Sequence, residues 1–238
     1  MAIVGVGNKI ELVRLDQLIN NDQNRKVFIS KVYDILPKKK LQIAMPIFEG
    51  KIVPLEVGDR YNAVFYTAGG LLQANVSIAS RYKSGNLFYM DVELLAEPTK
   101  VQRREFYRYN CKIDLKIRKV TEKEYETGVP EDMSVPEESL FETGRILDIS
   151  GGGLRLIQSK NYDRNQLVKV QFTIPILNEI DTFHLFGRVI SSTLLMEGKH
   201  DVFEQRMEFL KIRQEDRDKI VRFIFESERM ARAKESGR

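Results

Sequence analysis

The octapeptide CKIDLKIR at residues 111–118 alternates apolar and charged side chains without a break. Apolar residues at every second position lie on one face of an extended chain, so this stretch predicts a β-strand with one buried face. The face toward solvent would carry Lys112, Asp114, Lys116 and Arg118. Similar apolar patterns recur at residues 145–149, 153–158, 168–174, 182–193 and 202–210. The second half therefore predicts a small antiparallel β-barrel.

The first half also consists of short apolar segments separated by turn residues. The segments lie at residues 9–14, 26–36, 41–48, 61–69, 71–80 and 86–95. This pattern is typical of a meander that closes into a barrel. We therefore predict a mainly β protein with two small antiparallel barrels in tandem. The predicted parts are a first domain at residues 1–97, a basic hinge at 98–110 and a second domain at 111–238.

Only the end of the chain shows the periodicity of a helix, at residues 214–232. Its apolar side would carry Ile220, Val221, Phe223, Ile224 and Phe225. We expect this helix to close an open end of the second barrel. Docking on a partner protein or on an anionic membrane is the alternative.

Length and composition place the chain among compact globular proteins. Its 238 residues are 42% hydrophobic and 30% charged, which excludes fibrous, collagen-like and disordered classes. A long uncharged stretch, residues 61–80, carries asparagines and glycines that are poorly matched to lipid. The first residues also lack the basic segment and apolar stretch of a secretory signal. We therefore expect a cytoplasmic protein without membrane insertion.

Charge is distributed unevenly along the chain. Residues 99–119 hold eight basic and two acidic residues, whereas residues 121–143 hold one basic and eight acidic residues. Pro130 and Pro136 interrupt the acidic segment, so we interpret it as an exposed loop. A positive field flanked by a negative one suits a small anionic ligand better than DNA or another long nucleic acid, which the acidic loop would repel.

Residue types that carry catalysis or bind metals are scarce. The chain has two histidines, His184 and His200, and a single cysteine, Cys111. Neither histidine has neighbours that suggest a triad or a metal site, and one cysteine excludes an internal disulfide. The sequence DISGG at residues 148–152 lacks the first glycine of a nucleophile elbow. We therefore predict no catalytic residues, no metal and no cofactor, and a function other than an enzyme.

Three arginines cluster in QRREFYR, residues 102–108, at positions Arg103, Arg104 and Arg108. Planar guanidinium groups bind phosphate oxygens through paired hydrogen bonds and stack on purine rings. On a flexible connection, such a cluster can wrap a nucleotide. The spacing alone favours a solvated basic linker, since Arg213 and Arg217 repeat it.

A second motif follows further along the chain, where Asp148, Ser150 and Gly153 lie at a turn between two predicted strands. A carboxylate can accept hydrogen bonds from N1 and N2 of guanine, and a hydroxyl can add another at its edge. Glycine allows a close approach of the backbone to a ligand, or a positive φ. The same residues also form a good turn by themselves. Their position after the arginines favours a nucleotide site.

The two motifs together resemble the signatures of the PilZ domain, a bacterial receptor for cyclic di-GMP. These signatures are RxxxR, at Arg104 and Arg108, and [DN]xSxxG, at Asp148, Ser150 and Gly153. The resemblance extends from residue 101 to the C-terminal helix. The first half, with LQIAMPIFEGKIVPLEVGDRYNAVFYT at residues 41–67, resembles the N-terminal barrel of the YcgR-type flagellar-brake proteins.

The resemblance implies a six-stranded second barrel with a C-terminal α-helix, and cyclic di-GMP bound between the arginine segment and the barrel surface. Arg104 and Arg108 would hold phosphate and guanine, and Asp148, Ser150 and Gly153 would surround a guanine. The ligand would bind as one molecule or as a stacked pair.

Arg103, next to the motif, is a further expected contact at the hinge. Binding would order residues 99–109 and change the arrangement of the two barrels, which requires contacts made in one arrangement only. One departure from the family pattern is Arg206, since many relatives have glycine at this place in the last strand.

The resemblance also implies a partner. The liganded receptor would act as a motility brake on a stator or rotor protein of the flagellar motor, recruited to the flagellar basal body. Control of exopolysaccharide synthesis is the alternative within the family. A different class, an RNA-binding tandem barrel, would use residues 99–119, although Phe106, Tyr107 and Tyr109 are few for a stacking surface.

Overall fold

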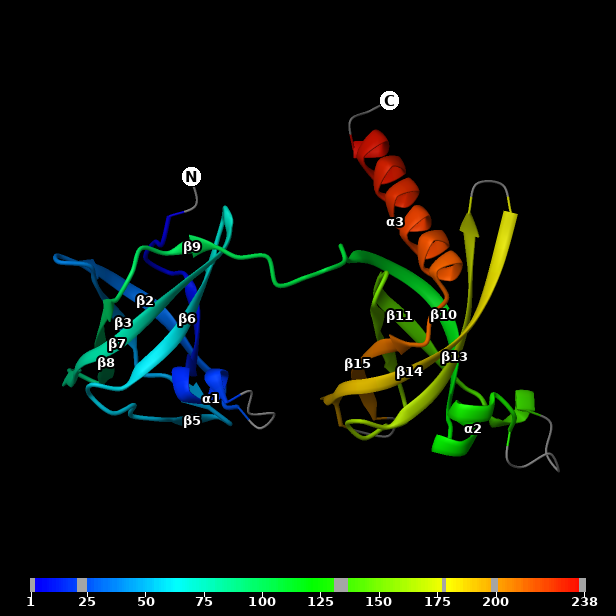
Figure 1. The fold of residues 1–238 in the computed structure, drawn as a ribbon, viewed down its shortest axis with the longest axis horizontal. Coiled ribbons are helices and arrows are strands. Elements are labelled where there is room, and N and C mark those ends of the chain that lie inside the picture. The colour runs from blue at the N-terminus through cyan, green and yellow to red at the C-terminus, as the bar shows by residue number, and fades with distance from the viewer. Residues whose placement is uncertain (1–2, 21–24, 131–136, 177–178, 198–200, 236–238) are drawn as a thin grey trace. The chain divides into compact units, whose positions relative to one another are not determined.

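The computed structural model describes residues 3–20, 25–130, 137–176, 179–197 and 201–235 (Figure 1). The chain forms two compact units, Met1–Arg103 and Arg104–Arg238. Each unit is built mainly of antiparallel strands, which confirms the mainly β class.

The first unit is a closed ring of strands. Its strands are β1 (Lys9–Arg14), β2 (Phe28–Leu36), β3 (Lys40–Ala44), β4 (Ile47–Phe48), β5 (Lys51–Ile52), β6 (Arg60–Thr67), β7 (Gly70–Ser84), β8 (Leu87–Leu94) and β9 (Thr99–Lys100). Pairing runs in the order β1-β6-β7-β8-β3-β2, and β2 also pairs with β1, which closes the ring. A short helix, α1 (Leu15–Ile19), follows β1, where period-two alternation predicted no helix. The strand β9, within the predicted hinge, pairs with β7.

The second unit is a closed six-stranded barrel in the order β10-β11-β12-β15-β14-β13. Its strands are β10 (Tyr109–Lys119), β11 (Glu142–Ser150), β12 (Gly153–Gln158), β13 (Leu167–Ile176), β14 (Glu179–Met196) and β15 (Val202–Leu210). The order describes two three-stranded meanders, β10-β11-β12 and β13-β14-β15, joined along two seams. The seams are the β10–β13 and β12–β15 pairings.

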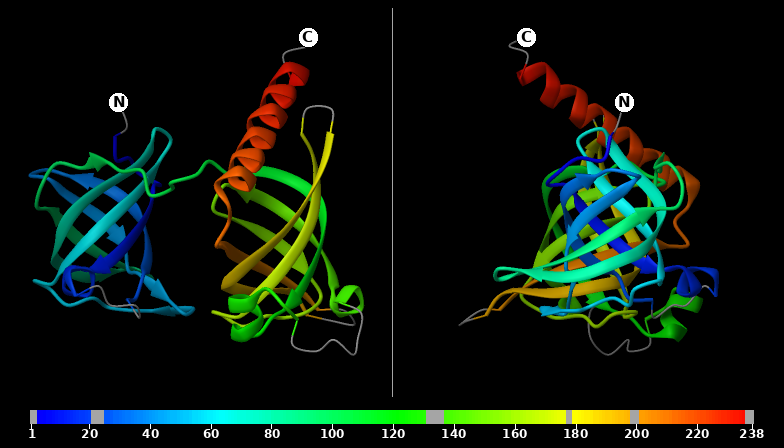
Figure 2. Two further views of the ribbon diagram at one scale, coloured as in Figure 1. Left: turned by 45° about the vertical axis from the view of Figure 1, so that its right-hand side comes forward. Right: turned by 90° about the vertical axis from the view of Figure 1, so that its left-hand side faces the viewer.

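The predicted C-terminal helix is confirmed as α3 (Gln214–Glu235), which covers one end of the second barrel. Ile220, Phe223 and Ile224 are buried in the barrel core, because they recur at helical spacing on one face. Phe225, expected on the same face, has 62% of its surface exposed. The C-terminal part of α3 extends away from the barrel (Figure 2). No helix in the described ranges is long and apolar enough to cross a membrane.

The prediction of an exposed loop throughout residues 121–143 is wrong. This acidic segment contains a helix, α2 (Glu122–Thr127), and a 3₁₀ turn, η1 (Glu137–Leu140). The Thr121 side chain caps α2 by accepting the Glu124 N–H at 3.1 Å. Glu124 is buried against Arg118, which was expected to face solvent and is also buried. Residues 131–136, with Pro136, lie outside the described part of the chain.

Candidate ligand-binding site

The two arginines of the RxxxR motif lie on the irregular connection between β9 and β10. Arg104 and Arg108 are both exposed. Within the described ranges, neither side chain makes a hydrogen bond or an ion pair. A guanidinium without a protein partner keeps all its donors available, so both groups can bind an anion.

Arg103 has a different environment. Its Nη1 and Nη2 donate to Glu11 Oε2 at 3.3 and 3.2 Å, and Nη2 also donates to Tyr66 Oη at 3.0 Å. Burial alone would raise the pKa of Glu11, but hydrogen bonds from Tyr66, Lys9 and Arg103 outweigh it and lower this pKa below its ordinary value. The first unit therefore holds Arg103 through an ionised carboxylate, and its contact with a ligand stays a prediction.

The second motif lies at the turn between β11 and β12. Ser150 ends β11, Gly153 begins β12, and the two residues face each other in the strand register. Ser150 Oγ donates to the Gly153 carbonyl oxygen at 3.1 Å and accepts the Gly152 N–H at 3.4 Å. The hydroxyl thus shapes the turn, and a remaining lone pair can accept a hydrogen bond from a ligand.

Residue 153 must be glycine because the backbone of β15 lies too close for a side chain, and not because of its φ angle. It is not among the glycines with positive φ. A Cβ atom at this position would lie 2.1 Å from the Met207 carbonyl oxygen and 3.0 Å from Glu208 Cα. Because both are backbone atoms of β15, no side chain fits at residue 153 while β12 and β15 stay paired.

Sequence reasoning missed Arg155, the residue that fixes Asp148. Arg155 Nε donates to Asp148 Oδ2 at 2.6 Å, and Nη1 donates to Glu204 Oε2 at 2.8 Å. The hydrogen bonds to Asp148 and Glu204 raise the pKa of Arg155. A tight turn that pairs Ser150 with Gly153 also pairs Asp148 with Arg155, so the predicted hairpin contained the signal for this ion pair. Asp148 Oδ1 remains available as an acceptor.

Phe106, between the two arginines of the first motif, packs on the turn that carries the second motif. A Cβ atom on Gly151 or Gly152 would lie 2.7 or 2.9 Å from the Phe106 ring, so the ring lies directly on the backbone of the β11–β12 turn. Arg104 and Arg108 are two residues to either side of this ring. The two motifs are therefore adjacent within the second unit.

Cys111 of β10 lies close to the motif. Burial, and then the negative charge of Asp148, raise the pKa of its thiol to about 12. The thiol therefore stays protonated at neutral pH and is a poor nucleophile. Among the described residues, no group of three His, Cys, Asp or Glu side chains could hold a metal ion. His200 lies outside these residues.

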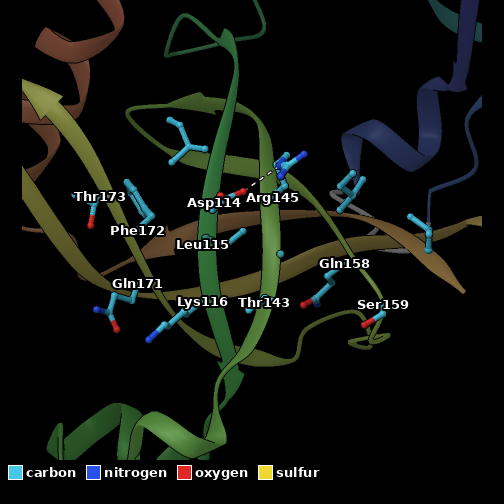
Figure 3. Close-up of a pocket in the computed structure, with 14 residues that line it drawn as sticks. Asp114, Leu115, Lys116, Thr143, Arg145, Gln158, Ser159, Gln171, Phe172 and Thr173 are labelled. Atoms are coloured by element: carbon cyan, nitrogen blue, oxygen red, sulfur yellow. Dashed lines mark hydrogen bonds and ion pairs between the residues drawn. The ribbon is translucent and has the colours of Figure 1, made fainter. Parts of the chain in front are cut away.

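A cavity of about 850 Å³ lies elsewhere in the second unit (Figure 3). It is lined by residues 113–116, 143–145, 157–159 and 171–173 and by Val202. An ion pair of Arg145 with Asp114, with Nε 3.0 Å from Oδ1, lies among these side chains. None of the six predicted ligand contacts lines the cavity, so the candidate site is the surface of the β11–β12 turn.

Two family models match the chain. The PilZ domain model matches residues 102–226, and the model of the flagellar protein YcgR matches residues 5–93. Among curated proteins, no sequence matches the chain.

Two solved structures are similar in fold over most of the chain. The Bacillus subtilis inhibitor of motility MotI/DgrA is 16% identical, with 94% of this chain and 98% of that chain covered and a TM-score of 0.69. YcgR of Escherichia coli, solved in complex with c-di-GMP, is 15% identical, with 97% and 88% covered and a TM-score of 0.53. At these identities the likeness establishes the fold.

Proposed function

This chain belongs to the PilZ domain family, and on that premise we propose that it is a receptor for cyclic di-GMP that regulates flagellar motility. One observation carries the proposal. The unpaired guanidinium groups of Arg104 and Arg108 flank Phe106, which lies on the turn that holds Asp148 and Ser150. Anion-binding groups and guanine-binding groups therefore belong to one surface.

Each group has a role in the proposed complex. The guanidinium groups of Arg104 and Arg108 bind the phosphates and stack on guanine. Asp148 Oδ1 accepts hydrogen bonds from guanine N1 and N2, while Arg155 holds the other carboxylate oxygen. Ser150 accepts a further hydrogen bond at the guanine edge, and Gly153 leaves the turn without a side chain.

Two findings support a role in motility. The first unit matches the model of the flagellar protein YcgR, and the MotI structure is that of an inhibitor of motility. We propose that the liganded protein acts as a brake by docking on a stator or rotor protein of the flagellar motor. Its output would then be binding and not catalysis.

Isothermal titration with cyclic di-GMP tests the receptor proposal. Arg104→Ala and Arg108→Ala are each expected to weaken binding by about 10- to 150-fold, because each loses hydrogen bonds to a charged phosphate. Arg213→Ala is the matched control, since Arg213 starts the other RxxxR spacing and is bound to Asp216 at 2.8 Å. This control is expected to bind as the wild type does.

Controls with GTP, cyclic di-AMP and a single-stranded RNA complete the titration. Guanine-selective binding supports the receptor, and the stoichiometry gives one ligand or a stacked pair. Absence of binding to cyclic di-GMP, or tighter binding to RNA with a steep salt dependence, would contradict it.

Binding is also expected to change the arrangement of the two units. The boundary between them falls between Arg103, which is bound to Glu11 and Tyr66, and Arg104, a proposed ligand contact. A ligand that holds Arg104 acts directly on this joint. Small-angle scattering curves with and without cyclic di-GMP, at a concentration that saturates the wild type but lies below the Kd of Arg104→Ala, should therefore differ for the wild type and coincide for the variant. Coinciding wild-type curves would exclude the rearrangement.

A further inference from the structure

We propose that Phe106 is a positioning residue, which holds Arg104 and Arg108 beside the β11–β12 turn before any ligand binds, and that Arg217 of α3 in turn holds Phe106. The inference rests on the proposed function, because Arg104 and Arg108 are its phosphate contacts. It adds two residues that neither motif specifies, Phe106 at a variable position of RxxxR and Arg217 on α3, and makes the C-terminal helix part of the ligand-binding unit.

The first step is the contact of Phe106 with a pair of glycines. A Cβ atom on Gly151 would lie 2.7 Å from a ring carbon of Phe106, and one on Gly152 would lie 2.9 Å from another. Both distances are too short for a real Cβ atom, so the ring needs glycine at both positions. Val221 Cγ2 of α3 lies 3.1 Å from the same position on Gly151. The backbone of the turn and the side of α3 therefore both border the ring. The ring can pack on the turn because glycine has no Cβ atom.

The second step is the contact of Phe106 with Arg217. The Arg217 guanidinium carbon lies 4.9 Å from the ring centroid, within the range of a cation–π interaction. In the described part of the chain, no carboxylate pairs with Arg217, whereas Arg213, one turn earlier, is paired with Asp216. Buried Ile220 fixes the next turn of α3 on the barrel, so Arg217 holds the ring from a rigid element.

A neighbouring contact ties the same segment to α3 a second time. Tyr107 Oη donates to Glu228 Oε1 at 3.2 Å. Partial burial, and then the charge of Glu228, raise the pKa of Tyr107, so the hydroxyl stays protonated and remains a donor at neutral pH. The arginine segment is thus bound to α3 at two consecutive residues, and its docking on the turn depends on the helix.

Docking of the segment sets the fraction of molecules that is ready to bind. If undocking leaves Arg104 and Arg108 away from Asp148, the apparent affinity falls in proportion to the docked fraction. Loss of the Phe106 side chain is expected to lower this fraction about tenfold. Loss of the Arg217 guanidinium alone is expected to lower it about two- to fivefold, which corresponds to an exposed cation–π contact.

Limited proteolysis tests the docking without any ligand. Trypsin cleavage after Arg104 and Arg108 is followed by mass spectrometry in the full chain, with cleavage after Lys39, in an exposed turn of the first unit, as the internal reference. Phe106→Ala is expected to be cleaved about tenfold faster at the two arginines, since cleavage follows the population of the open form. Phe106→Tyr, which keeps the ring, should behave as the wild type. Equal rates in all three proteins would overturn the proposal.

Binding affinities in a double-mutant cycle test the role of Arg217. Phe106→Ala should weaken cyclic di-GMP binding about tenfold and Arg217→Met about two- to fivefold, with unchanged thermal midpoints of the unliganded proteins. Because Arg217 acts through the ring, the double variant should bind no more weakly than Phe106→Ala. Losses that multiply would show that Arg217 acts independently of Phe106. Arg213→Met is the matched control and should bind as the wild type does.

The two proposals fail in different ways. If the wild type does not bind cyclic di-GMP but Phe106→Ala is cleaved faster, the receptor proposal is wrong and the docking stands. If Arg104→Ala weakens binding as expected while Phe106→Ala binds and is cleaved as the wild type is, only the positioning role is wrong.

Discussion

Replacing Gly153 by alanine is expected to destabilise the second unit by at least about 3 kcal/mol. The new Cβ atom would lie 2.1 Å from the Met207 carbonyl oxygen, so β12 and β15 cannot stay paired at this rung. Hydrogen exchange should report the change, with amides of β12 and β15 exchanging roughly a hundredfold faster. Amides of the first unit are the internal reference, because the two units are separate.

Gly144→Ala is the matched comparison in the same barrel. A Cβ atom there would lie 3.0 Å from the Ile157 carbonyl oxygen and 3.2 Å from Leu115 Cδ2. These contacts are tight but can relax by small shifts, so the expected cost is about 1 kcal/mol. A Gly153→Ala protein that is as stable as Gly144→Ala would contradict the steric argument.

Glu124→Gln is expected to cost about 3–5 kcal/mol, because it removes the charge from one member of a buried, bidentate ion pair. The side chains of Arg118 and Glu124 are 4% and 5% exposed, and the pair is bidentate. Differential scanning calorimetry of the full chain should show the transition of the second unit lowered by roughly 10–20 °C. The transition of the first unit should not move.

Two further variants separate burial from charge. Asp114→Asn breaks an ion pair between β10 and Arg145 of β11, whose side chains are 83% and 55% exposed, and it should cost less than about 1 kcal/mol. Arg118→Met combined with Glu124→Gln removes the buried guanidinium as well and should recover much of the lost stability. If Glu124→Gln and Asp114→Asn have equal effects, the buried pair does not stabilise α2 as argued.

Alternation predicted the strands well because it reflects which side of a strand faces a core. Ile113, Leu115 and Ile117 do face inward in β10, as the octapeptide indicated. The same rule was wrong for Arg118, because it assumes that the outer face of a strand meets water. At this end of β10 the helix α2 covers that face, and Arg118 pairs with Glu124 beneath it.

The helix α2 itself could not be predicted from propensity. It has six residues, too few to form a stable helix alone. Its stability comes from the Thr121 cap and from the buried pair with Arg118. Pro130, Pro136 and the high acidic content of this segment are typical of a loop. The cap and the buried ion pair that stabilise α2 are tertiary contacts, which the sequence pattern does not show.

The candidate site was predictable only in part. Asp148, Ser150 and Gly153 occupy the expected turn, because turn chemistry is local. Phe106 carried no signal, since its partners are a glycine pair and an arginine that are distant in sequence. Arg103 was expected beside the ligand, but in this structure it binds Glu11 and Tyr66. Contact of all six residues with cyclic di-GMP remains a prediction.

The two meanders of the second barrel have a consequence for folding kinetics. Within each meander, strands adjacent in sequence pair with one another, so these contacts are local and form early. The β12–β15 seam joins strands far apart in the chain and closes late, after the loop-closure entropy has been overcome. Gly153 lies in this seam, and the bond of Arg155 to Glu204 crosses it. A folding intermediate with both meanders formed would already hold the β11–β12 turn, but Arg155 would lack Glu204, so Asp148 gains its fully anchored partner only when the seam closes.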